Sequence, residues 1–481
     1  MTGIAGLGTY LPRYRIEASE ITDAWGQFHG AGITKTAVPD ADEDALTMAH
    51  ETAVRALRAS ETAAEDIETL LVATTTPPMA EDPIDPRLAS TLGLPETVRS
   101  RQFTGSTRAG TEALVAALDG PLPALVVASD APRGEPDSET EHAAGAGAVA
   151  AVVTSDGEGT ITDTAEHVTP VPGTRYRAAD STATTGLGIA NYDRSAYTGA
   201  LTAAIEQLDV DPAEAAAVAP QAPNGKLPYR LEGSLGIDSE QLDQGIFVDA
   251  VGDTGAASPL FGFAAALADG AGDAILVGYG SGSATALAVA DPVPLVANED
   301  QIPAHGEGLL DRTEGEQESL SYGEYLRMRG EITTGEPEGG GAYVSVPSWK
   351  RTIPQRHRLV AGRCEECGTL TLPPKGACTD CGTFEEFEMV RLPGTGTVEA
   401  ATEIGAGGAP PEFVEQQARS GPYTSAIVAL DGPDGGSVSI PAQVVEHDGD
   451  VDIGDPVEAT IRRVYTQEGV IRYGFKMRPQ P

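Results

Sequence analysis

All four cysteines of this 481-residue chain lie in one short stretch, as two C-x-x-C pairs. The pairs are Cys364 with Cys367 and Cys378 with Cys381. Each pair can place two thiolates on one tight turn, and the glycine that follows each pair lets the backbone fold toward a metal. Four thiolates around one ion form a closed tetrahedral site, so the spacing predicts a structural zinc ribbon. Two disulfides or a dithiol redox motif explain this pattern less well.

The charge of the chain limits its partners. It has 72 acidic and 31 basic residues, a net charge of -41, which argues against nucleic acid and anionic membranes as partners. Only five of the basic residues are lysines. Such a composition is similar to that of cytoplasmic proteins from extreme halophiles, where concentrated salt screens self-repulsion; an ordinary acidic protein is the alternative. No long apolar run or signal-peptide core is present, so we expect a cytoplasmic protein.

The first three hundred residues alternate between apolar segments of strand length and longer amphipathic segments. This alternation predicts an α/β fold with buried sheets. The strand candidates are 69–76, 124–130, 147–154, 274–279 and 284–290. The clearest helix candidates are 44–57 and 196–208.

The last third of the chain has a different character. An acidic, glycine-rich region from about 298 to 348 contains a short helix candidate at 322–329 and a flexible stretch at 335–341. We place the first domain boundary there. Beyond the cysteines the apolar residues alternate at period two, as in Ile471, Tyr473 and Phe475, which predicts a small all-β barrel.

A concentrated basic patch directly precedes the cysteines. It comprises Lys350, Arg351, Arg356, His357, Arg358 and Arg363. The patch could belong to a nucleic-acid module, since small barrels can bind oligonucleotides. It could equally contact the phosphates of a nucleotide-like cofactor, contact an acidic partner, or form a solvated helix.

Several motifs before residue 330 resemble those of archaeal hydroxymethylglutaryl-CoA synthases, in the same order. They lie at 3–16, 35–57, 143–148, 222–226, 252–255 and 279–282. The resemblance implies a thiolase-like five-layered αβαβα fold of two similar halves, working as a homodimer. The remainder, from about 350, is similar to the zinc-ribbon and OB-fold proteins that accompany thiolases.

These observations predict five regions in the chain. Two thiolase-like halves cover 1–160 and 161–330. A linker at 331–355 leads to a zinc ribbon at 356–385. An OB-fold barrel covers 386–481.

The resemblance also shows that the expected catalytic residues are missing. The family uses a cysteine nucleophile, a histidine and a glutamate, and these positions match Thr107, Gln221 and Thr75 here. A threonine hydroxyl is a weak acid that needs an adjacent base, and glutamine cannot take up a proton near neutrality. The absence of a thiol does not depend on the alignment, because no cysteine precedes Cys364.

Neighbouring residues could supply catalytic groups in place of the matched positions. Between His167 and His305 there is no histidine in any register. Glu81 or Asp82 could replace the glutamate, and Ser106 could act as a shifted nucleophile.

The other motif residues are candidates for binding acyl-CoA or CoA. They are Arg108, Asn224, Gly225, Gly280 and Gly282. Close packing and turn formation explain the glycines and Asn224 equally well.

Three functional hypotheses follow. The first is a catalytically degenerate synthase homologue that binds or channels acyl-CoA and docks a thiolase as an accessory subunit. The second is an active acyltransferase that condenses or hydrolyses acyl-CoA by an altered mechanism. The third is a nucleic-acid binder that acts through the ribbon and barrel.

Overall fold

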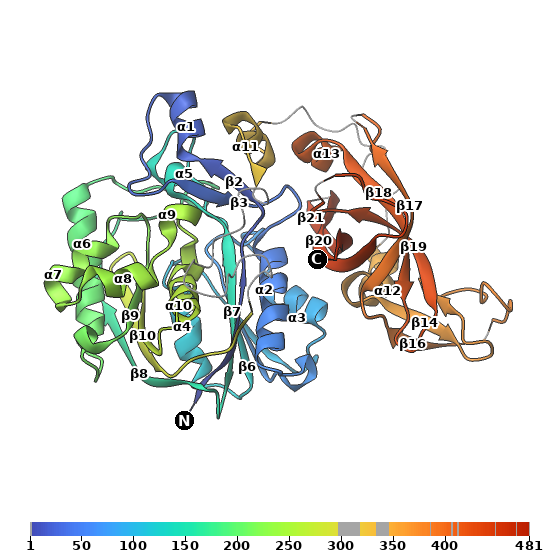
Figure 1. Cartoon of the computed structure of the whole chain (residues 1–481), viewed down its shortest axis with the longest axis horizontal. Helices are drawn as coiled ribbons and strands as arrows, with labels where there is room; N and C mark the ends of the chain where they lie inside the picture. The colour runs from blue at the N-terminus through green and yellow to red at the C-terminus, as the bar shows by residue number, and fades with distance from the viewer. Residues whose placement is uncertain are drawn as a thin grey trace. The chain divides into compact units, whose positions relative to one another are not determined.

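The computed structural model describes residues 2–296, 318–332 and 346–480, apart from 385, 406, 411, 412, 448 and 468. These residues form two compact units (Figure 1). The first unit contains Met1–Asp40, Asp44–Ala89 and Gly93–Tyr325, and the second contains Ala41–Glu43, Ser90–Leu92 and Leu326–Pro481. The flexible stretch expected at 335–341 lies outside the described residues.

A ten-stranded mixed sheet forms the first unit, in the order β5-β4-β6-β7-β1-β8-β11-β10-β9, with β12 beside β1. The strands are β1 (Gly3–Tyr10), β4 (Thr69–Ala73), β5 (Arg99–Phe103), β6 (Ala124–Asp130), β7 (Gly147–Thr154), β8 (Gly159–Val168), β9 (Ala217–Pro220), β10 (Asp273–Gly280), β11 (Ser283–Ala290) and β12 (Leu295–Val296). The sheet consists of two halves that join where Gly3 and Ile4 of β1 pair with the start of β8.

Helices cover and separate the two halves of this sheet. Helices α4 (Ala109–Ala117) and α10 (Ser258–Ala268) lie between the halves, and most of their residues are buried. Helix α2 (Ala45–Ala59) packs on β1, β6 and β7, and α6 (Ala190–Ile205) packs on β8, β10 and β11 (Figure 1). This arrangement confirms the predicted five-layered αβαβα fold.

The remaining elements of the first unit are short. A small sheet joins β13 (Glu318–Ser319), β2 (Tyr14–Glu17) and β3 (Lys35–Val38). The short helices are α1 (Ala18–Trp25), α3 (Asp85–Leu92), α5 (Glu139–Ala143), α7 (Glu232–Leu235), α8 (Ser239–Gly245), α9 (Val248–Val251) and α11 (Tyr322–Met328); the ends of α3 and α11 are assigned to the second unit.

Two of the sequence predictions need correction in this unit. The strand expected at 69–76 ends at Ala73, so three threonines leave the sheet and turn toward the end of β6. The helix expected at 196–208 begins earlier, at Ala190, and ends at Ile205. The first difference matters for function because it creates the wall of a cavity.

The second unit contains the ribbon and the barrel. The ribbon sheet consists of β14 (Val360–Cys364), β15 (Leu370–Thr371) and β16 (Phe387–Arg391). Strands β17 (Thr395–Ile404), β18 (Tyr423–Asp431), β19 (Ser437–Val444), β20 (Pro456–Gln467) and β21 (Val470–Pro479) close into the predicted barrel. Helices α12 (Val346–Arg358) and α13 (Val414–Ser420) complete the unit, so residues 346–355 of the expected linker are helical.

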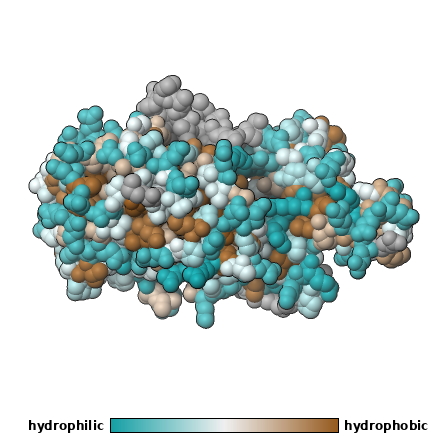
Figure 2. All heavy atoms as spheres, turned by 90° about the horizontal axis from the view of Figure 1, so that it is seen from below, coloured by the Kyte–Doolittle hydropathy of each residue, from teal (hydrophilic) through white to brown (hydrophobic). Residues whose placement is uncertain are grey.

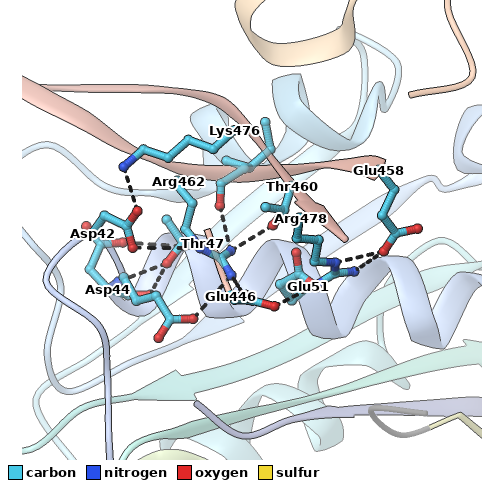
Figure 3. A network of polar contacts seen from close by, with 12 residues as sticks. Asp42, Asp44, Thr47, Glu51, Glu446, Glu458, Thr460, Arg462, Lys476 and Arg478 are labelled. Atoms are coloured by element: carbon cyan, nitrogen blue, oxygen red, sulfur yellow. Dashed lines mark hydrogen bonds and ion pairs between the residues drawn. The ribbon is translucent and has the colours of Figure 1, made fainter. Parts of the chain in front are cut away.

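A buried ionic network holds the acidic segment Ala41–Glu43 within the second unit (Figure 3). The side chain of Arg462 is 1% exposed and pairs with Asp42, Glu43 and Glu446. The Lys476 ammonium donates a hydrogen bond to Asp42 at 2.6 Å. Buried charges are tolerated only when they are paired, so these groups depend on one another. The sequence analysis did not predict this network.

The surface is mostly polar. On the face shown in Figure 2, apolar residues occur in small groups among hydrophilic ones. Among the described helices, none combines the length and the apolar character that crossing a membrane requires.

Candidate functional site

The first unit has a cavity of about 140 Å³ beyond the carboxyl ends of β4, β5 and β10. Its lining residues are Thr75, Gly105, Ser106, Thr107, Arg175, Tyr176, Arg177, Thr184, Gly280 and Ser281. Thr75 and Thr107, two of the three residues that we expect at the family's catalytic positions, therefore lie on one cavity. Among the described residues that line it there is no histidine and no carboxylate.

Thr107, which we expect at the position of the nucleophile, lies just before α4. The residue is buried, and its hydroxyl donates a hydrogen bond to the main-chain carbonyl oxygen of Tyr279 at 2.5 Å. The hydroxyl proton is thus held by a carbonyl oxygen, which cannot act as a general base. This geometry does not activate Thr107 for attack.

Thr75, which we expect at the position of the glutamate, faces a buried carboxylate, Asp130. The hydroxyls of Thr74, Thr75 and Thr76 donate to Asp130 at 2.8 to 2.9 Å. The backbone N–H groups of Thr75, Thr76 and Ala256 add three more bonds at 2.7 to 2.9 Å. Burial raises the pKa of Asp130 above its usual value, although these hydrogen bonds oppose the shift. With both oxygens engaged, Asp130 organises the wall and is not placed to act as a base.

Asp130 was missed by the sequence analysis. It ends a continuously apolar strand, and a polar residue at the carboxyl end of a buried strand is the signal that could have revealed it. Its partners come from two other segments, which the sequence pattern alone does not bring together.

Gln221, which we expect at the position of the histidine, does not line the cavity. The residue is 2% exposed, and its amide nitrogen donates to the carbonyl oxygen of Gly255 at 2.8 Å. The hydroxyl of Tyr197 donates to the main-chain oxygen of Gln221 at 2.6 Å. The bond to Gly255 orients the neutral side chain of Gln221, and the bond from Tyr197 holds its main chain.

A hairpin at 174–186 supplies the cationic wall of the cavity. Tyr176 and Thr185 pair across it. Arg175 forms an ion pair with Asp253 at 2.5 Å, and Arg177 donates to the carbonyl oxygen of Thr75 at 2.5 Å. The sequence analysis missed both arginines because this polar loop carries no periodic pattern or recognised motif.

Of the five candidate binding residues, the structure places only Gly280 on the cavity. A Cβ atom there would lie 2.0 Å from the Ser106 hydroxyl oxygen, so a larger residue would force that hydroxyl to move. Gly282 has a φ of 91° and packs against the carbonyl oxygen of Thr169. Its role is therefore in the turn.

The other three candidates make internal contacts. Arg108 donates to Thr285 at 3.2 Å and pairs with Glu112 at 3.6 Å. Asn224 accepts bonds from two backbone N–H groups of its own turn. Gly225 packs so closely on another backbone segment that a Cβ would meet a carbonyl oxygen at 2.3 Å.

The alternative catalytic candidates do not come together in a catalytic site either. Glu81 and Asp82 are exposed and do not line the cavity, and Asp82 pairs with Arg87 at 2.5 Å. Ser106 does line the cavity, where its oxygen accepts a bond from the backbone N–H of Arg108. No base lies among the described lining residues to activate it.

The four cysteines of the ribbon meet as predicted. The sulfurs of Cys364 and Cys381 are 3.7 Å apart, and those of Cys367 and Cys378 are 3.6 Å apart. A tetrahedral zinc ion with Zn–S bonds of about 2.3 Å requires sulfurs ~3.8 Å apart. All four ligand atoms lie within 4.8 Å of one another, so the residues fit zinc.

A second group with metal-ligating side chains contains His29, Asp137 and His142. The Nδ1 atom of His142 accepts a hydrogen bond from the backbone N–H of His29 at 2.9 Å. The neutral ring therefore carries its proton on Nε2, which faces Asp137 at 3.8 Å. A metal ligand must be unprotonated, so this arrangement disfavours a metal.

The basic patch does not form one surface. His357 is buried and shares a hydrogen bond with Ser90 at 3.0 Å. The Arg356 guanidinium lies 4.5 Å above the ring of Trp349, and Arg363 is paired with two carboxylates. Half of the patch is thus engaged internally.

Fold and sites together define a thiolase-like protein that carries a zinc ribbon and a small OB-type barrel. Residues 351–388 match the family described as "ChsH2, rubredoxin-like zinc ribbon domain", and 389–462 match "ChsH2, C-terminal OB-fold domain". A solved hydroxymethylglutaryl-CoA synthase complexed with CoA superimposes with a TM-score of 0.60 at 19% identity, over 72% of this chain and 94% of the other. A 3-oxoacyl-(acyl carrier protein) synthase III from Pseudomonas aeruginosa gives 0.55 at 19% identity, over 61% and 99%.

The curated relatives are closer in sequence. The hydroxymethylglutaryl-CoA synthase of Methanopyrus kandleri is 32% identical over 354 residues, which cover 68% of this chain and 97% of the relative. That of Pyrobaculum arsenaticum is 30% identical, over 68% and 97%. The chain belongs to the hydroxymethylglutaryl-CoA synthase family.

Proposed function

We propose that this chain is a non-catalytic family member that binds or channels acyl-CoA and serves as an accessory subunit for a thiolase. One observation carries the proposal. We place Thr107, Gln221 and Thr75 at the positions of nucleophile, histidine and glutamate, and each of these neutral side chains is engaged in an internal hydrogen bond. The three side chains are thus held by contacts within the protein and are not poised for catalysis.

Retention of the cavity supports ligand binding. The wall that Thr75, Thr107 and Gly280 form is intact, and solved relatives of this fold are complexed with CoA or with 3-hydroxy-3-methylglutaryl coenzyme A. A cavity without a thiol can bind a thioester, but it has no cysteine to which the acyl group could be transferred.

An active enzyme of altered mechanism finds less support. Such an enzyme would need a base to activate water or an acyl-CoA carbon. Of the carboxylates next to the described wall, Asp130 accepts six hydrogen bonds and Asp253 is paired with Arg175. The nucleic-acid hypothesis is weakened because three of the six basic-patch residues have internal partners.

Binding and turnover should be measured on the full chain at multi-molar KCl. Calorimetry with acetyl-CoA and acetoacetyl-CoA is expected to show binding, while a thiol assay detects no released CoA. Turnover that disappears in Thr107→Ala or Gln221→Ala would overturn the proposal.

The partner requires a separate experiment. Affinity purification of the tagged chain from its native cells is expected to recover a thiolase. A homodimer recovered without any acyl-CoA enzyme counts against the accessory role.

A further inference from the structure

Two arginines of the second unit stack on one tryptophan ring. The guanidinium carbons of Arg356 and Arg472 lie 4.5 and 4.6 Å from the ring centroid of Trp349. Trp349 and Arg356 belong to α12, and Arg472 belongs to β21, on which α12 packs. The spacing of Trp349, Thr352 and Arg356 places them on one face of the helix. Helix and strand thus bring two cations to one aromatic side chain.

Within the described part of the chain, neither of these guanidinium groups has an anionic partner. The Nε atom of Arg356 donates to the Thr352 hydroxyl at 3.2 Å, and the Nε atom of Arg472 is buried without a hydrogen-bond partner. Other cations of the same unit do pair with carboxylates; they are Arg363, Arg419, Arg462, Lys476 and Arg478. The pair on the tryptophan ring therefore differs from its neighbours.

The two guanidinium groups also repel each other. Burial lowers the pKa of Arg356 below its ordinary value, Tyr465 opposes the shift, and the neighbouring Arg472 adds to it. Arginine stays charged near neutrality all the same, so two like charges lie close together in half-buried positions. An anion that contacts both groups would relieve this repulsion.

The residues around the ring indicate a protein partner rather than a small anion. Trp349, Tyr465 and the two arginines are all half-buried. Tryptophan, tyrosine and arginine are the residues that most often dominate the binding energy of protein–protein interfaces. Tyr465 also lines a pocket of about 30 Å³, which has room for one or two water-sized groups. Rings, guanidinium groups and a recess together suit a protein segment that carries a carboxylate.

We propose that the cluster of Trp349, Arg356 and Arg472 is a docking site for an acidic side chain of a partner protein. The two guanidinium groups donate several N–H bonds to the carboxylate oxygens, and the indole packs on the rest of the segment. A long polyanion such as nucleic acid is disfavoured, because the chain has a net charge of -41. The inference rests on the accessory role proposed above and names the surface that meets the partner.

Tryptophan fluorescence tests this site directly. The chain has two tryptophans, so in Trp25→Phe the emission comes from Trp349 alone. The full chain with this change is titrated with a peptide that alternates glutamate and serine, and with a matched peptide that has glutamine in place of glutamate. We expect the glutamate peptide to change the emission and to bind at least about tenfold more tightly, as one charge-assisted hydrogen bond provides. KCl is kept at the lowest concentration that preserves the circular dichroism spectrum, because salt screens exposed charges.

Variants in the Trp25→Phe background separate recognition from folding. Arg472→Gln should weaken the binding of the glutamate peptide at least about tenfold. Arg356→Lys keeps the charge but not the planar fork of N–H groups, and it should weaken binding as well. Arg99→Gln removes an exposed arginine of β5 in the first unit and should leave the affinity unchanged. Unchanged affinity in both cluster variants would overturn the proposal.

The other occupants are separate outcomes of the test. Equal binding of the two peptides shows that the cluster does not recognise a carboxylate, and the proposal fails. Inorganic phosphate or a single-stranded oligonucleotide that binds as tightly as the glutamate peptide makes the cluster a phosphate site instead. A dimer that dissociates in Arg472→Gln, measured by sedimentation, makes a second copy of this chain the occupant.

Failure of the inference is distinguishable from failure of the proposed function. If purification from native cells recovers no partner enzyme, the accessory role is rejected together with the docking site that depends on it. If a partner is recovered equally well with Arg472→Gln and with Arg99→Gln, the accessory role stands and the cluster is not its docking site. Calorimetry with acyl-CoA measures the other part of the proposed function independently.

Discussion

The hydroxyl of Thr107 lies 2.5 Å from the main-chain carbonyl oxygen of Tyr279 and donates a hydrogen bond to it. Thr107 precedes α4, and Tyr279 lies near the end of β10, so the bond links a central helix to the second half of the sheet. We expect Thr107 at the position of the family's nucleophile, and here its hydroxyl makes a structural contact.

Thr107→Ala should therefore reduce stability rather than activity. Loss of the bond leaves a buried carbonyl oxygen without this donor, and the free energy of unfolding should fall by about 1 kcal/mol. Denaturant unfolding measures the effect, and Thr107→Ser, which keeps the hydroxyl, is the matched control. A fall in CoA release with unchanged stability would contradict the structural role.

Asp130→Asn should lower the free energy of unfolding more than Thr107→Ala does. Of the six groups that donate to Asp130, some would face the amide N–H₂ of asparagine, which is itself a donor. We expect a loss of about 3 kcal/mol in unfolding free energy, a magnitude typical of broken buried charge networks. Thr76→Val, which removes one donor, should cost less; equal effects of the two changes would argue against Asp130 as the centre of the network.

The sequence predicted the framework well because apolar runs of strand length report burial directly. The expected strands 124–130 and 147–154 coincide with β6 and β7. The cysteine site was equally predictable, since its ligands are close in sequence and spaced by the geometry of two turns.

What escaped prediction depends on contacts between distant segments. Asp42 and Lys476 pair although 434 positions separate them. Arg175 and Arg177 reach the cavity because a hairpin closes between Tyr176 and Thr185. Nothing in the sequence around Asp42 indicates its contact with Lys476, and nothing around the two arginines indicates the cavity.

The imidazole of His142 should make stability depend on pH. Burial and the neighbouring His29 lower the pKa of His142 to about 4, from an ordinary value near 6.5. The unfolded chain takes up the proton first, so this contribution is complete above pH 6.5 and is lost as the pH falls toward 4. The loss should reach about 3 kcal/mol in unfolding free energy. Denaturant unfolding at a series of pH values measures this loss. His142→Phe, which can keep the ring stack with Phe28, should reduce the dependence of the unfolding free energy on pH.

Arg462→Met should destabilise the second unit. The side chain is 1% exposed, and its removal takes away a buried guanidinium that pairs with Asp42, Glu43 and Glu446. We expect the free energy of unfolding of the barrel to fall by about 3 kcal/mol. Hydrogen exchange in β20 and β21 measures the effect. Arg391→Gln, at an exposed position of β16, is the control. Unchanged exchange in the barrel strands of the Arg462 variant would show that the network contributes little.

Zinc should be required for the ribbon but not for the first unit. The sulfur separations match a tetrahedral thiolate site, so we expect one zinc per chain by elemental analysis. The three ribbon strands are short, and residues such as Ala361 and Val390 share a core with the barrel. Removal of zinc by a chelator under reducing conditions should therefore expose 360–391 to protease and weaken the barrel, while β6 and β7 keep their exchange protection. Cys364→Ser should reproduce this effect without a chelator. A metal-free chain with full protection of 360–391 would show that the cysteines pack without needing an ion.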